Sequence, residues 1–597
     1  MKPTDTDDPE YFHKVVDCQY GCPAHTPVPE YIRLIAAGRY TDAYMVNWES
    51  NVFPGILGRT CDRPCEPVCR RGRVESEPVA ICRLKRVAAD FKGSIEDRLP
   101  LIPDIKNGRR IALIGAGPAS LTVARDLAPM GYSIDLYDNQ PLGGGFMRSQ
   151  IPSFRLPTTV LEEEVDIILN MGINSHFETY VDSLKSILDK SYDAVFVGTG
   201  APQGSDLNIP GREECQAHIH VGIDWLSSVA FEHIEKIGKK VLVLGGGNTA
   251  MDCCRTARRL GGEDVKVVVR SEFERMKASP WEIEDAVAEG IPILNNHVPL
   301  AFVHEDGVLT GMRFNKVDVV YDENGTRSLI PTGEEIFFEA DEVLVAIGQD
   351  NAFPWIERDI GIEFGKWDIP TLDKETFQST LPQVFFGGDA AFGPENIITA
   401  VAHGHQAAIS IDLFLSGEDI KDRPPPTVNL VSQKMGVHEW SYDSQVSNDD
   451  RFKVPHADKE MTLKDRKVEV ELGFAREVAY QEAMRCLNCD VQTVFTTSKC
   501  IECDACVDIC PTACINFIDN AEEEPLRVAL RMPATNLAQD LYVSELLPQT
   551  GRIMAKDEDV CLHCGLCAER CPTGAWDMQR FLYSVTQADS ACKQKAQ

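Results

Sequence analysis

Short apolar runs followed by glycine-rich turns dominate the hydrophobic pattern in the middle of the chain. The run IALI, residues 111–114, leads into GAGPAS, a helical stretch and a second apolar run that ends at Asp138. The order repeats from residue 239, where VLVL leads into GGGN and a last run ends at Arg270. A strand, a glycine turn, a helix and a second strand make a βαβ unit of a parallel sheet. The pattern therefore predicts two such units.

Outside these units the pattern is less regular. No apolar run approaches the ~20 residues that a membrane span requires. The N-terminal MKPTDTDDPEYFHK lacks the basic start and apolar core of a secretory signal, so we expect a cytoplasmic protein. Residues 416–480 contain RPPPT and few sustained apolar periods, which predicts extended chain lying along the other domains rather than a further domain.

The first glycine turn has the residue types of a dinucleotide site. Gly115 permits the tight turn, and Gly117 lets backbone N–H groups approach a pyrophosphate at the helix N-terminus. Ser120 takes the place of a third glycine and is small enough to keep helix and strand close. Asp138 stands where an acid binds a ribose, so the turn predicts a bound dinucleotide.

The second turn differs at the end of its second strand. Gly245, Gly247 and Ala250 repeat the small residues, but Arg270 replaces the acid. An acid would bond the ribose 2′-hydroxyl of NAD, whereas arginine can pair with the 2′-phosphate of NADP. We therefore expect NADPH at this turn, with NADH as the alternative.

Composition sets wider bounds. The 597 residues, 43% apolar and 25% charged, are those of a folded chain of roughly three to five domains. A net charge of −33 argues against nucleic acid or an anionic membrane as partner, because phosphate polyanions are bound by clustered lysine and arginine. Twenty-one cysteines are too many for disulfides in a reducing compartment and indicate metal or iron–sulfur ligation.

Two cysteine runs near the C-terminus have the spacing C-x2-C-x2-C-x3-C-P and resemble the bacterial two-cluster ferredoxin. In that protein the fourth cysteine of each run ligates the other cluster. A structural zinc site is the alternative, but it rarely has this doubled run with prolines. The resemblance assigns one 4Fe-4S cluster to Cys500, Cys503, Cys506 and Cys571, and its twin to Cys561, Cys564, Cys567 and Cys510.

Five further segments carry a second resemblance. YDAVFVGTGAP (192–202), DEVLVAIGQ (341–349) and VFFGGDAAFGPENIITAVAHGHQAA (384–408) resemble flavoprotein oxidoreductases with two dinucleotide domains. GGGFMRSQIPSFRLP (143–157) and GRTCDRPCEPVC (58–69) are similar to the glutamate synthase small subunit and the N-terminal half of dihydropyrimidine dehydrogenase.

This resemblance implies that the first βαβ fold binds FAD and that the second, inserted fold binds NADPH. It puts Asp389 on the ribityl chain of the flavin and Lys277 on the 2′-phosphate, although the basic residue that often follows the first arginine is Ser271 here. His403, His405 and His563 are expected to be structural or to tune a cofactor. Further cofactor contacts are expected at Gly145, Arg155, Gly200, Asn248, Thr249, Gly348 and Gly388.

The family also carries two 4Fe-4S clusters in a helical N-terminal domain, and one of them begins with A-M-R-C-L-x-C. Here AMRCLNC lies near the C-terminus, so the resemblance assigns that cluster to Cys18, Cys69, Cys486 and Cys489. A redox-active dithiol is the alternative for RCLNC, but no βαβ pattern surrounds it.

The second N-terminal cluster takes Cys22, Cys61 and Cys65, and its fourth ligand in the family falls on Lys85. Lysine cannot ligate iron, but Cys82 lies three residues earlier, on the same helix face, and supplies a soft thiolate. Four sites of four cysteines leave five that we expect to be structural. These are Cys215, Cys253, Cys254, Cys514 and Cys592.

The expected fold class is multidomain α/β, with two Rossmann-like domains, a helical iron–sulfur domain at the N-terminus and a ferredoxin-like α+β domain at the C-terminus. The expected boundaries are 1–100 for the helical 4Fe-4S domain, 101–235 and 341–415 for the FAD domain, 236–340 for the inserted NAD(P)H domain, 416–480 for a connector, and 481–597 for the CxxC segment with the ferredoxin domain.

The expected function is an NAD(P)H:acceptor oxidoreductase whose cofactors, rather than a catalytic acid or base, carry the chemistry. A flavin takes two electrons together and a 4Fe-4S cluster takes one, so the chain converts between the two. Residues 481–597 carry net charge −7, which favours a fixed partner subunit of 2-oxoacid, aldehyde or acyl-CoA type over an acidic soluble ferredoxin. A glutamate synthase small-subunit role and a non-catalytic assembly subunit are the alternatives.

Overall fold

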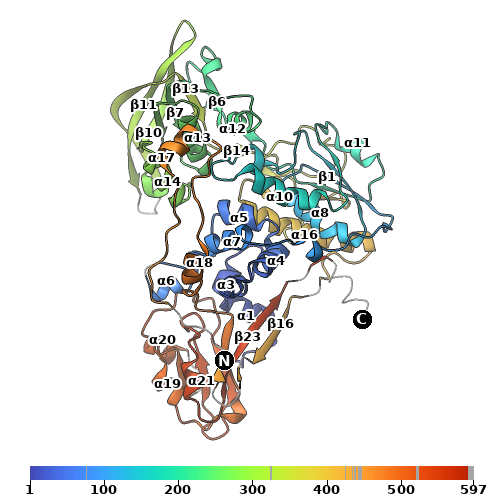
Figure 1. Cartoon of the computed structure of the whole chain (residues 1–597), viewed down its shortest axis with the longest axis vertical. Coiled ribbons are helices and arrows are strands. Elements are labelled where there is room, and N and C mark those ends of the chain that lie inside the picture. The colour runs from blue at the N-terminus through green and yellow to red at the C-terminus, as the bar shows by residue number, and fades with distance from the viewer. Residues whose placement is uncertain are drawn as a thin grey trace. The chain divides into compact units, whose positions relative to one another are not determined.

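The computed structural model describes residues 1–75, 77–322, 326–423, 425–432, 434–435, 439–440, 447–519, 523–585 and 587–588. It contains two compact units (Figure 1). The first unit comprises Met1–Leu99, Arg423–Val454 and Gly473–Gln597, and the second comprises Pro100–Asp422 and Pro455–Leu472. The predicted connector 416–480 is therefore shared between the units and forms no domain of its own.

Five parallel strands form one sheet of the second unit, in the order β15-β4-β1-β2-β3. Helix α16 (Ile397–Ser416) packs closely on α8 (Pro118–Leu127), because a Cβ on Gly404 would lie 2.6 Å from the carbonyl oxygen of Ala119. The other elements are β1 (Arg110–Ile114), β2 (Ser133–Tyr137), α9 (Phe146–Ser149), α10 (Thr158–Leu169), β3 (Asn174–His176), α11 (Leu184–Leu188), β4 (Ala194–Val197), β15 (Val384–Phe386) and α15 (Asp389–Phe392).

The second parallel sheet has the order β6-β13-β7-β8-β9. Its edge strand β6 (Ile219–Val221) and its inner strand β13 (Glu342–Val345) fall outside the predicted limits 236–340, so the inserted fold is larger than predicted. Pairing between β5 (Gln203–Gly204) and β14 (Gln349–Asp350) marks where the chain enters and leaves it. The other elements are α12 (Gly222–Ala230), β7 (Lys240–Leu244), α13 (Asn248–Arg259), β8 (Asp264–Val268), α14 (Pro280–Ala288) and β9 (Ile293–Leu294).

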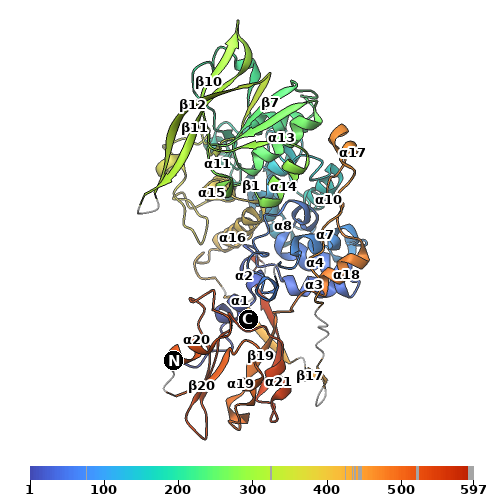
Figure 2. The same cartoon turned by 90° about the vertical axis from the view of Figure 1, so that its left-hand side faces the viewer.

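Two additions complete the second unit. Three long antiparallel strands, β10 (His297–Glu305), β11 (Val308–Tyr321) and β12 (Arg327–Glu339), form a separate sheet (Figure 2). The returning segment 455–472 carries helix α17 (Lys459–Lys464), which lies beside α13 (Figure 1).

Helices dominate the N-terminal part of the first unit. α5 (Pro54–Thr60) and α7 (Ile81–Asp90) pack so closely that a Cβ on Gly58 would lie 2.6 Å from Cα of Arg86. Helix α18 (Arg476–Ala483) packs against α3 and α7, which brings the RCLNC segment to the N-terminal helices. The remaining helices are α1 (Pro9–Val15), α2 (Asp17–Tyr20), α3 (Val28–Ala36), α4 (Tyr40–Asn51) and α6 (Arg71–Val74).

Among the described residues, the C-terminal part of the first unit has three small antiparallel sheets, β16-β23-β19, β20-β22-β21 and the pair β17 (Lys434–Met435) and β18 (Glu439–Trp440). Strand β16 (Thr427–Ser432) comes from the predicted connector and pairs along β23 (Trp576–Ser584). No helix in the described ranges is both long and apolar enough to span a bilayer. The remaining elements are β19 (Val491–Phe495), α19 (Ala505–Ile509), β20 (Ile515–Ile518), α20 (Glu524–Ala529), β21 (Tyr542–Leu546), β22 (Ile553–Lys556) and α21 (Leu566–Arg570).

Candidate functional site

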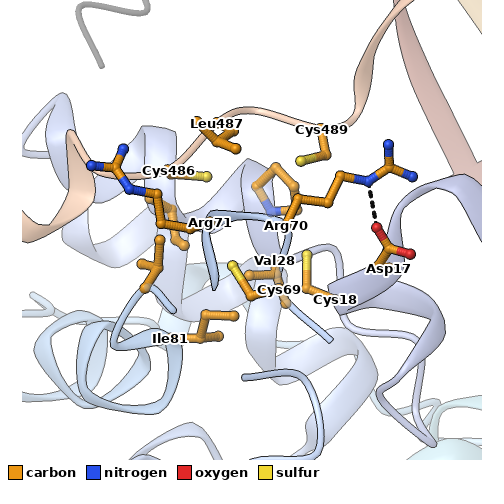
Figure 3. A pocket seen from close by; sticks show the side chains of 13 residues that line it. Asp17, Cys18, Val28, Cys69, Arg70, Arg71, Ile81, Cys486, Leu487 and Cys489 are labelled. Atoms are coloured by element: carbon orange, nitrogen blue, oxygen red, sulfur yellow. Dashed lines mark hydrogen bonds and ion pairs between the residues drawn. The ribbon is translucent and has the colours of Figure 1, made fainter. Parts of the chain in front are cut away.

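Four cysteines from the two ends of the chain line one pocket in the first unit. Their sulfur atoms point toward a shared space, with Cys18 and Cys69 on one side and Cys486 and Cys489 on the other (Figure 3). Burial raises the pKa of the Cys18 thiol, and the other three thiols raise it further. We name this set site A.

Buried polar contacts hold the C-terminal half of site A in place. Glu482 is fully buried and accepts hydrogen bonds from the backbone N–H groups of Ala80 at 2.7 Å and Phe452 at 2.9 Å. Arg485 is 1% exposed and donates to the carbonyl oxygens of Glu77 and Pro78. The segment that carries Cys486 is thereby anchored to the loop before α7.

A second set, named site B, gathers Cys22, Cys61, Cys65 and Cys82 beside helix α7. A hydrogen bond from Cys61 lowers the pKa of Cys82 to about 6, so these two sulfurs are direct neighbours. Lys85, one helical turn later, is 4% exposed. Burial lowers the pKa of Lys85, but the four thiols of site B raise it by more. The ammonium therefore lies among the four thiols as a counter-charge.

The two ferredoxin runs form the remaining sets. Site D consists of Cys500, Cys503, Cys506 and Cys571, which line one pocket together with Trp576. Site C consists of Cys510, Cys561, Cys564 and Cys567. Besides burial, the thiols of Cys561 and Cys510 raise the pKa of Cys564, which places these three together across the two runs.

The other cysteines are distributed as follows. Cys514, expected to be structural, has its sulfur 3.5 Å from that of Cys510 and therefore lies at the edge of site C. Cys215, Cys253 and Cys254 are buried in hydrophobic clusters of the second unit, as structural cysteines would be. Cys592 lies outside the described residues.

The first glycine turn of the second unit packs closely against neighbouring backbone. Gly115 has φ of +93°, and a Cβ there would lie 2.6 Å from the carbonyl oxygen of Gly198. Gly145 approaches the turn so closely that its Cβ would lie 2.7 Å from Cα of Gly117. Asp138 supports the same turn by accepting a hydrogen bond from the N–H of Ala116 at 2.6 Å, and burial raises the pKa of its carboxyl.

Several buried polar atoms beside this turn lack a partner within the described part of the chain. They include the hydroxyl oxygens of Ser120 and Thr199 and Nδ1 of His403. Burial also raises the pKa of Asp389 to about 6. Buried polar groups without partners are costly, so this region suits a ligand with hydroxyl and ring nitrogen groups, which FAD has.

Three further glycines were expected to contact a cofactor. Gly200 and Gly388 have φ of +69° and +61°, and a Cβ on Gly200 would meet nothing within 4 Å. Gly348 lies beside Ser205, directly before β14.

Arg155 lies differently from the expectation that it contacts a cofactor. Its Nη1 donates to both oxygens of Asp252 at 2.7 Å, and its Nη2 donates to Glu282 at 2.5 Å. These acids lie on α13 and α14 of the inserted fold, whereas Arg155 precedes α10 of the first fold. Three charged hydrogen bonds engage the guanidinium, so Arg155 ties the two dinucleotide folds together.

The second glycine turn has open space beside Gly247. Gly245 has φ of +137°, and a Cβ there would lie 2.1 Å from the carbonyl oxygen of Ala346, but one on Gly247 would meet nothing within 4 Å. Asn248 accepts a hydrogen bond from the N–H of Ser279 at 2.8 Å. Thr249 is half-buried beside it.

Basic side chains lie beyond the end of β8. Arg270 and Lys277 are exposed there, two and nine residues after the strand ends at Val268. Arg327 of β12 joins them, because it donates to the carbonyl oxygen of Arg270 at 3.2 Å and to the hydroxyl of Ser271 at 3.4 Å. No local sequence motif predicted a role for Arg327 at this site, because Arg327 is 57 residues from Arg270 in the chain.

Three known domain families match the chain. Pyridine nucleotide-disulphide oxidoreductase matches residues 109–404. Dihydropyrimidine dehydrogenase domain II, 4Fe-4S cluster, matches residues 13–96, and the 4Fe-4S dicluster domain matches residues 499–575. The predicted fold class and the combination of nucleotide-binding and 4Fe-4S domains are thereby confirmed.

Relatives with assigned roles cover most of the chain. NADP(+)-dependent formate dehydrogenase subunit beta of Moorella thermoacetica is 33% identical over 79% of this chain and 70% of its own length. NADPH-Fe(3+) oxidoreductase subunit beta of Geobacter sulfurreducens is 31% identical over 81% and 77%. The glutamate synthase [NADPH] small chain of Azospirillum brasilense is 31% identical over 66% of this chain and 86% of its own length.

Proposed function

Because the chain belongs to the pyridine nucleotide-disulphide oxidoreductases that also carry dihydropyrimidine dehydrogenase domain II and a 4Fe-4S dicluster domain, we propose that it is an electron-transfer subunit of a larger enzyme. It passes electrons between NADPH and a partner subunit through FAD and four 4Fe-4S clusters. When bound, the flavin exchanges a hydride with the nicotinamide as an electron pair and exchanges electrons singly with the clusters.

We assign FAD to the first glycine turn. Gly115 permits the tight turn, and a Cβ on Gly117 would meet only the carbonyl oxygen of Gly198 at 3.7 Å, so a pyrophosphate can approach the turn before α8. Gly145 lets the neighbouring loop approach the same turn. The buried hydroxyls of Ser120 and Thr199 are available to the ligand. Asp389, held at the N-terminus of α15, is assigned to the ribityl chain.

NADPH is assigned to the second glycine turn. The open space above Gly247 suits the pyrophosphate, and Arg270, Lys277 and Arg327 give a cationic edge for the 2′-phosphate. No acid is needed at this position, because NADP has no free 2′-hydroxyl to bind.

Each of sites A to D is assigned one 4Fe-4S cluster. The observation that carries the proposal is the meeting of Cys18, Cys69, Cys486 and Cys489 in one pocket, because a protein without a metal has no reason to turn four thiols from distant segments toward one another. A zinc ion would also accept four thiolates, so iron and zinc have to be distinguished by elemental analysis of the purified protein.

The test is reduction of a one-electron dye by the purified protein under anaerobic conditions, with NADPH and with NADH. We expect reduction that is faster with NADPH, whereas a non-catalytic assembly subunit would reduce nothing. Cys486→Ala should remove the EPR signal of one cluster. Cys254→Ala, which changes a core cysteine, should remove no cluster signal.

The partner is proposed to be a subunit with its own redox centre. Formate dehydrogenase joins the 2-oxoacid, aldehyde and acyl-CoA classes as a candidate because one relative is a formate dehydrogenase subunit. The glutamate synthase small chain is a second candidate role, favoured by the coverage of 86% of that relative. Mass spectrometry of the chains that co-purify with the native protein decides between these partners.

A further inference from the structure

A fully buried histidine joins site A to site C. His563 lies between two cysteines of site C, and its Nδ1 is 2.8 Å from the carbonyl oxygen of Cys489 in site A. A carbonyl oxygen only accepts, so Nδ1 carries the proton of this bond. The backbone N–H of His563 donates to the sulfur of Cys561 at 3.4 Å. One residue therefore connects a backbone group of site A to a sulfur of site C.

Arg70 makes a second connection. It follows Cys69 of site A in the chain and is 2% exposed. Its Nη1 donates to the carbonyl oxygen of Cys561 at 2.5 Å and to that of Glu558 at 2.6 Å, and its Nη2 donates to Val15 at 2.8 Å. Its Nε bonds to Asp17, as the dashed line in Figure 3 marks. The guanidinium is thus held on several sides, which fixes the contact between the two sites.

Buried charges hold the histidine ring in this position. Glu558 presents one carboxylate oxygen to Nε2 of His563 at 3.0 Å and the other to Nζ of Lys556 at 2.5 Å. Lys556 also donates to the hydroxyl of Thr493 at 2.9 Å. The three charged or ring side chains are at most 1% exposed. Buried charges are costly unless each is paired, and here each has a partner.

Site D lacks such a connection. Across the described ranges of the chain, no hydrogen bond joins Cys500, Cys503, Cys506 or Cys571 to a residue of site A or site B. Site D also lies nearer the surface of the described structure. Only Cys506 of its four ligands is buried, whereas Cys510, Cys561 and Cys567 of site C all are. Ile501, between two ligands of site D, is 48% exposed.

We propose that His563 and Arg70 couple site A to site C, so that site C is the inner and site D the outer site of the ferredoxin-like domain. The partner subunit then exchanges electrons at site D. This inference rests on the proposed function. Each transfer moves one electron, so that one site is oxidised and the next reduced, with no bond or proton changed. NADPH supplies the electron pair in one direction, and NADP+ receives it in the other.

A matched pair of variants tests the order. Cys564→Ala removes a ligand of site C and Cys503→Ala removes the equivalent, equally exposed ligand of site D. The readout is freeze-quench EPR of the one remaining ferredoxin-type cluster after mixing with NADPH. We expect Cys503→Ala to leave reduction of site C at the wild-type rate and Cys564→Ala to slow reduction of site D. Equal rates, or the reverse order, would overturn the proposal.

A second pair tests the two coupling residues. His563→Gln and Arg70→Met should each slow NADPH-driven reduction of the ferredoxin-type clusters by about 10- to 100-fold, the usual loss for residues that support metal ligands. Dithionite should still reduce every cluster. His563→Asn should recover part of the rate, because its amide nitrogen takes the position of Nδ1, whereas that of glutamine corresponds to Nε2. His233→Gln, which changes an exposed histidine of the second unit, should change nothing. A wild-type rate in both coupling variants overturns the proposal, whereas absence of NADPH-driven reduction in the wild type refutes the proposed function instead.

Discussion

Replacing Arg155 by methionine should destabilise the second unit, because it leaves the buried carboxylate of Asp252 without its cation. The side chains of Arg155, Asp252 and Glu282 are 11%, 7% and 6% exposed. Removing one partner of a buried pair costs about 3–5 kcal/mol. Glu282 keeps a contact with Arg255 at 3.3 Å, so only Asp252 is left unpaired and we expect the lower value, about 3 kcal/mol.

The assay is the temperature at which FAD fluorescence rises as the protein releases its flavin. For a unit of roughly 340 residues, about 3 kcal/mol corresponds to a decrease of about 4 °C. Arg155→Met with Asp252→Asn should regain part of this loss, because the neutral amide needs no cation. NADPH-dependent dye reduction should fall as well, since the contact holds the two dinucleotide folds in one orientation.

Arg109→Met is the matched control. Arg109 pairs with Asp193 at 2.8 Å, but its side chain is 53% exposed, and such surface pairs contribute about 0–1 kcal/mol. The reasoning is refuted if Arg155→Met releases flavin at the same temperature as Arg109→Met, because the buried pair would then contribute no more than an exposed one.

Three further predictions concern the cofactor sites. Cys82→Ala should lower the iron content by about four atoms per chain. Lys85→Met should keep the iron and shift only the reduction potential of the site B cluster, which a redox titration with EPR detection measures. Equal iron loss in both variants would contradict the assignment of site B. Arg270→Ala and Arg327→Ala should each raise the Kd for NADPH by about tenfold or more and leave the Kd for NADH nearly unchanged. The reason is that each variant removes a charge-assisted phosphate contact of about 1.5–3 kcal/mol. An equal loss of affinity for both nucleotides would indicate NADH as the natural cofactor. Gly245→Ala should abolish NADPH binding while the protein retains FAD. The added Cβ would lie 2.1 Å from the carbonyl oxygen of Ala346, so it disturbs the NADPH fold and leaves the FAD fold intact. Loss of FAD absorbance would instead indicate general misfolding.

The sequence predicts the parts of the molecule that depend on local geometry. The two glycine turns were predictable because positive φ and close backbone approach exclude other residues, as at Gly115 and Gly245. The helical spacing of Cys82 and Lys85 was predictable for a similar reason, since three residues bring both to one face of α7.

Features that depend on long-range contacts were not predictable. The limits of the inserted fold were set too narrowly because β6 and β13 join its sheet through pairing that no short motif encodes. The roles of Arg155 and Arg70 depend on partners 97 and 491 residues away. For His563 the sequence predicted only a structural or tuning role, because its neighbour Cys489 lies 74 residues earlier.

The most direct test of the central claim is an anaerobic reductive titration of the purified protein, followed by absorbance and EPR. One FAD takes two electrons and each 4Fe-4S cluster takes one, so four clusters predict about six electrons per chain. The same samples should contain about sixteen iron atoms and sixteen sulfides per chain. Uptake of about four electrons with about eight iron atoms would remove two of the four sites, and uptake of about two electrons would contradict the claim that this chain connects a flavin to iron–sulfur clusters.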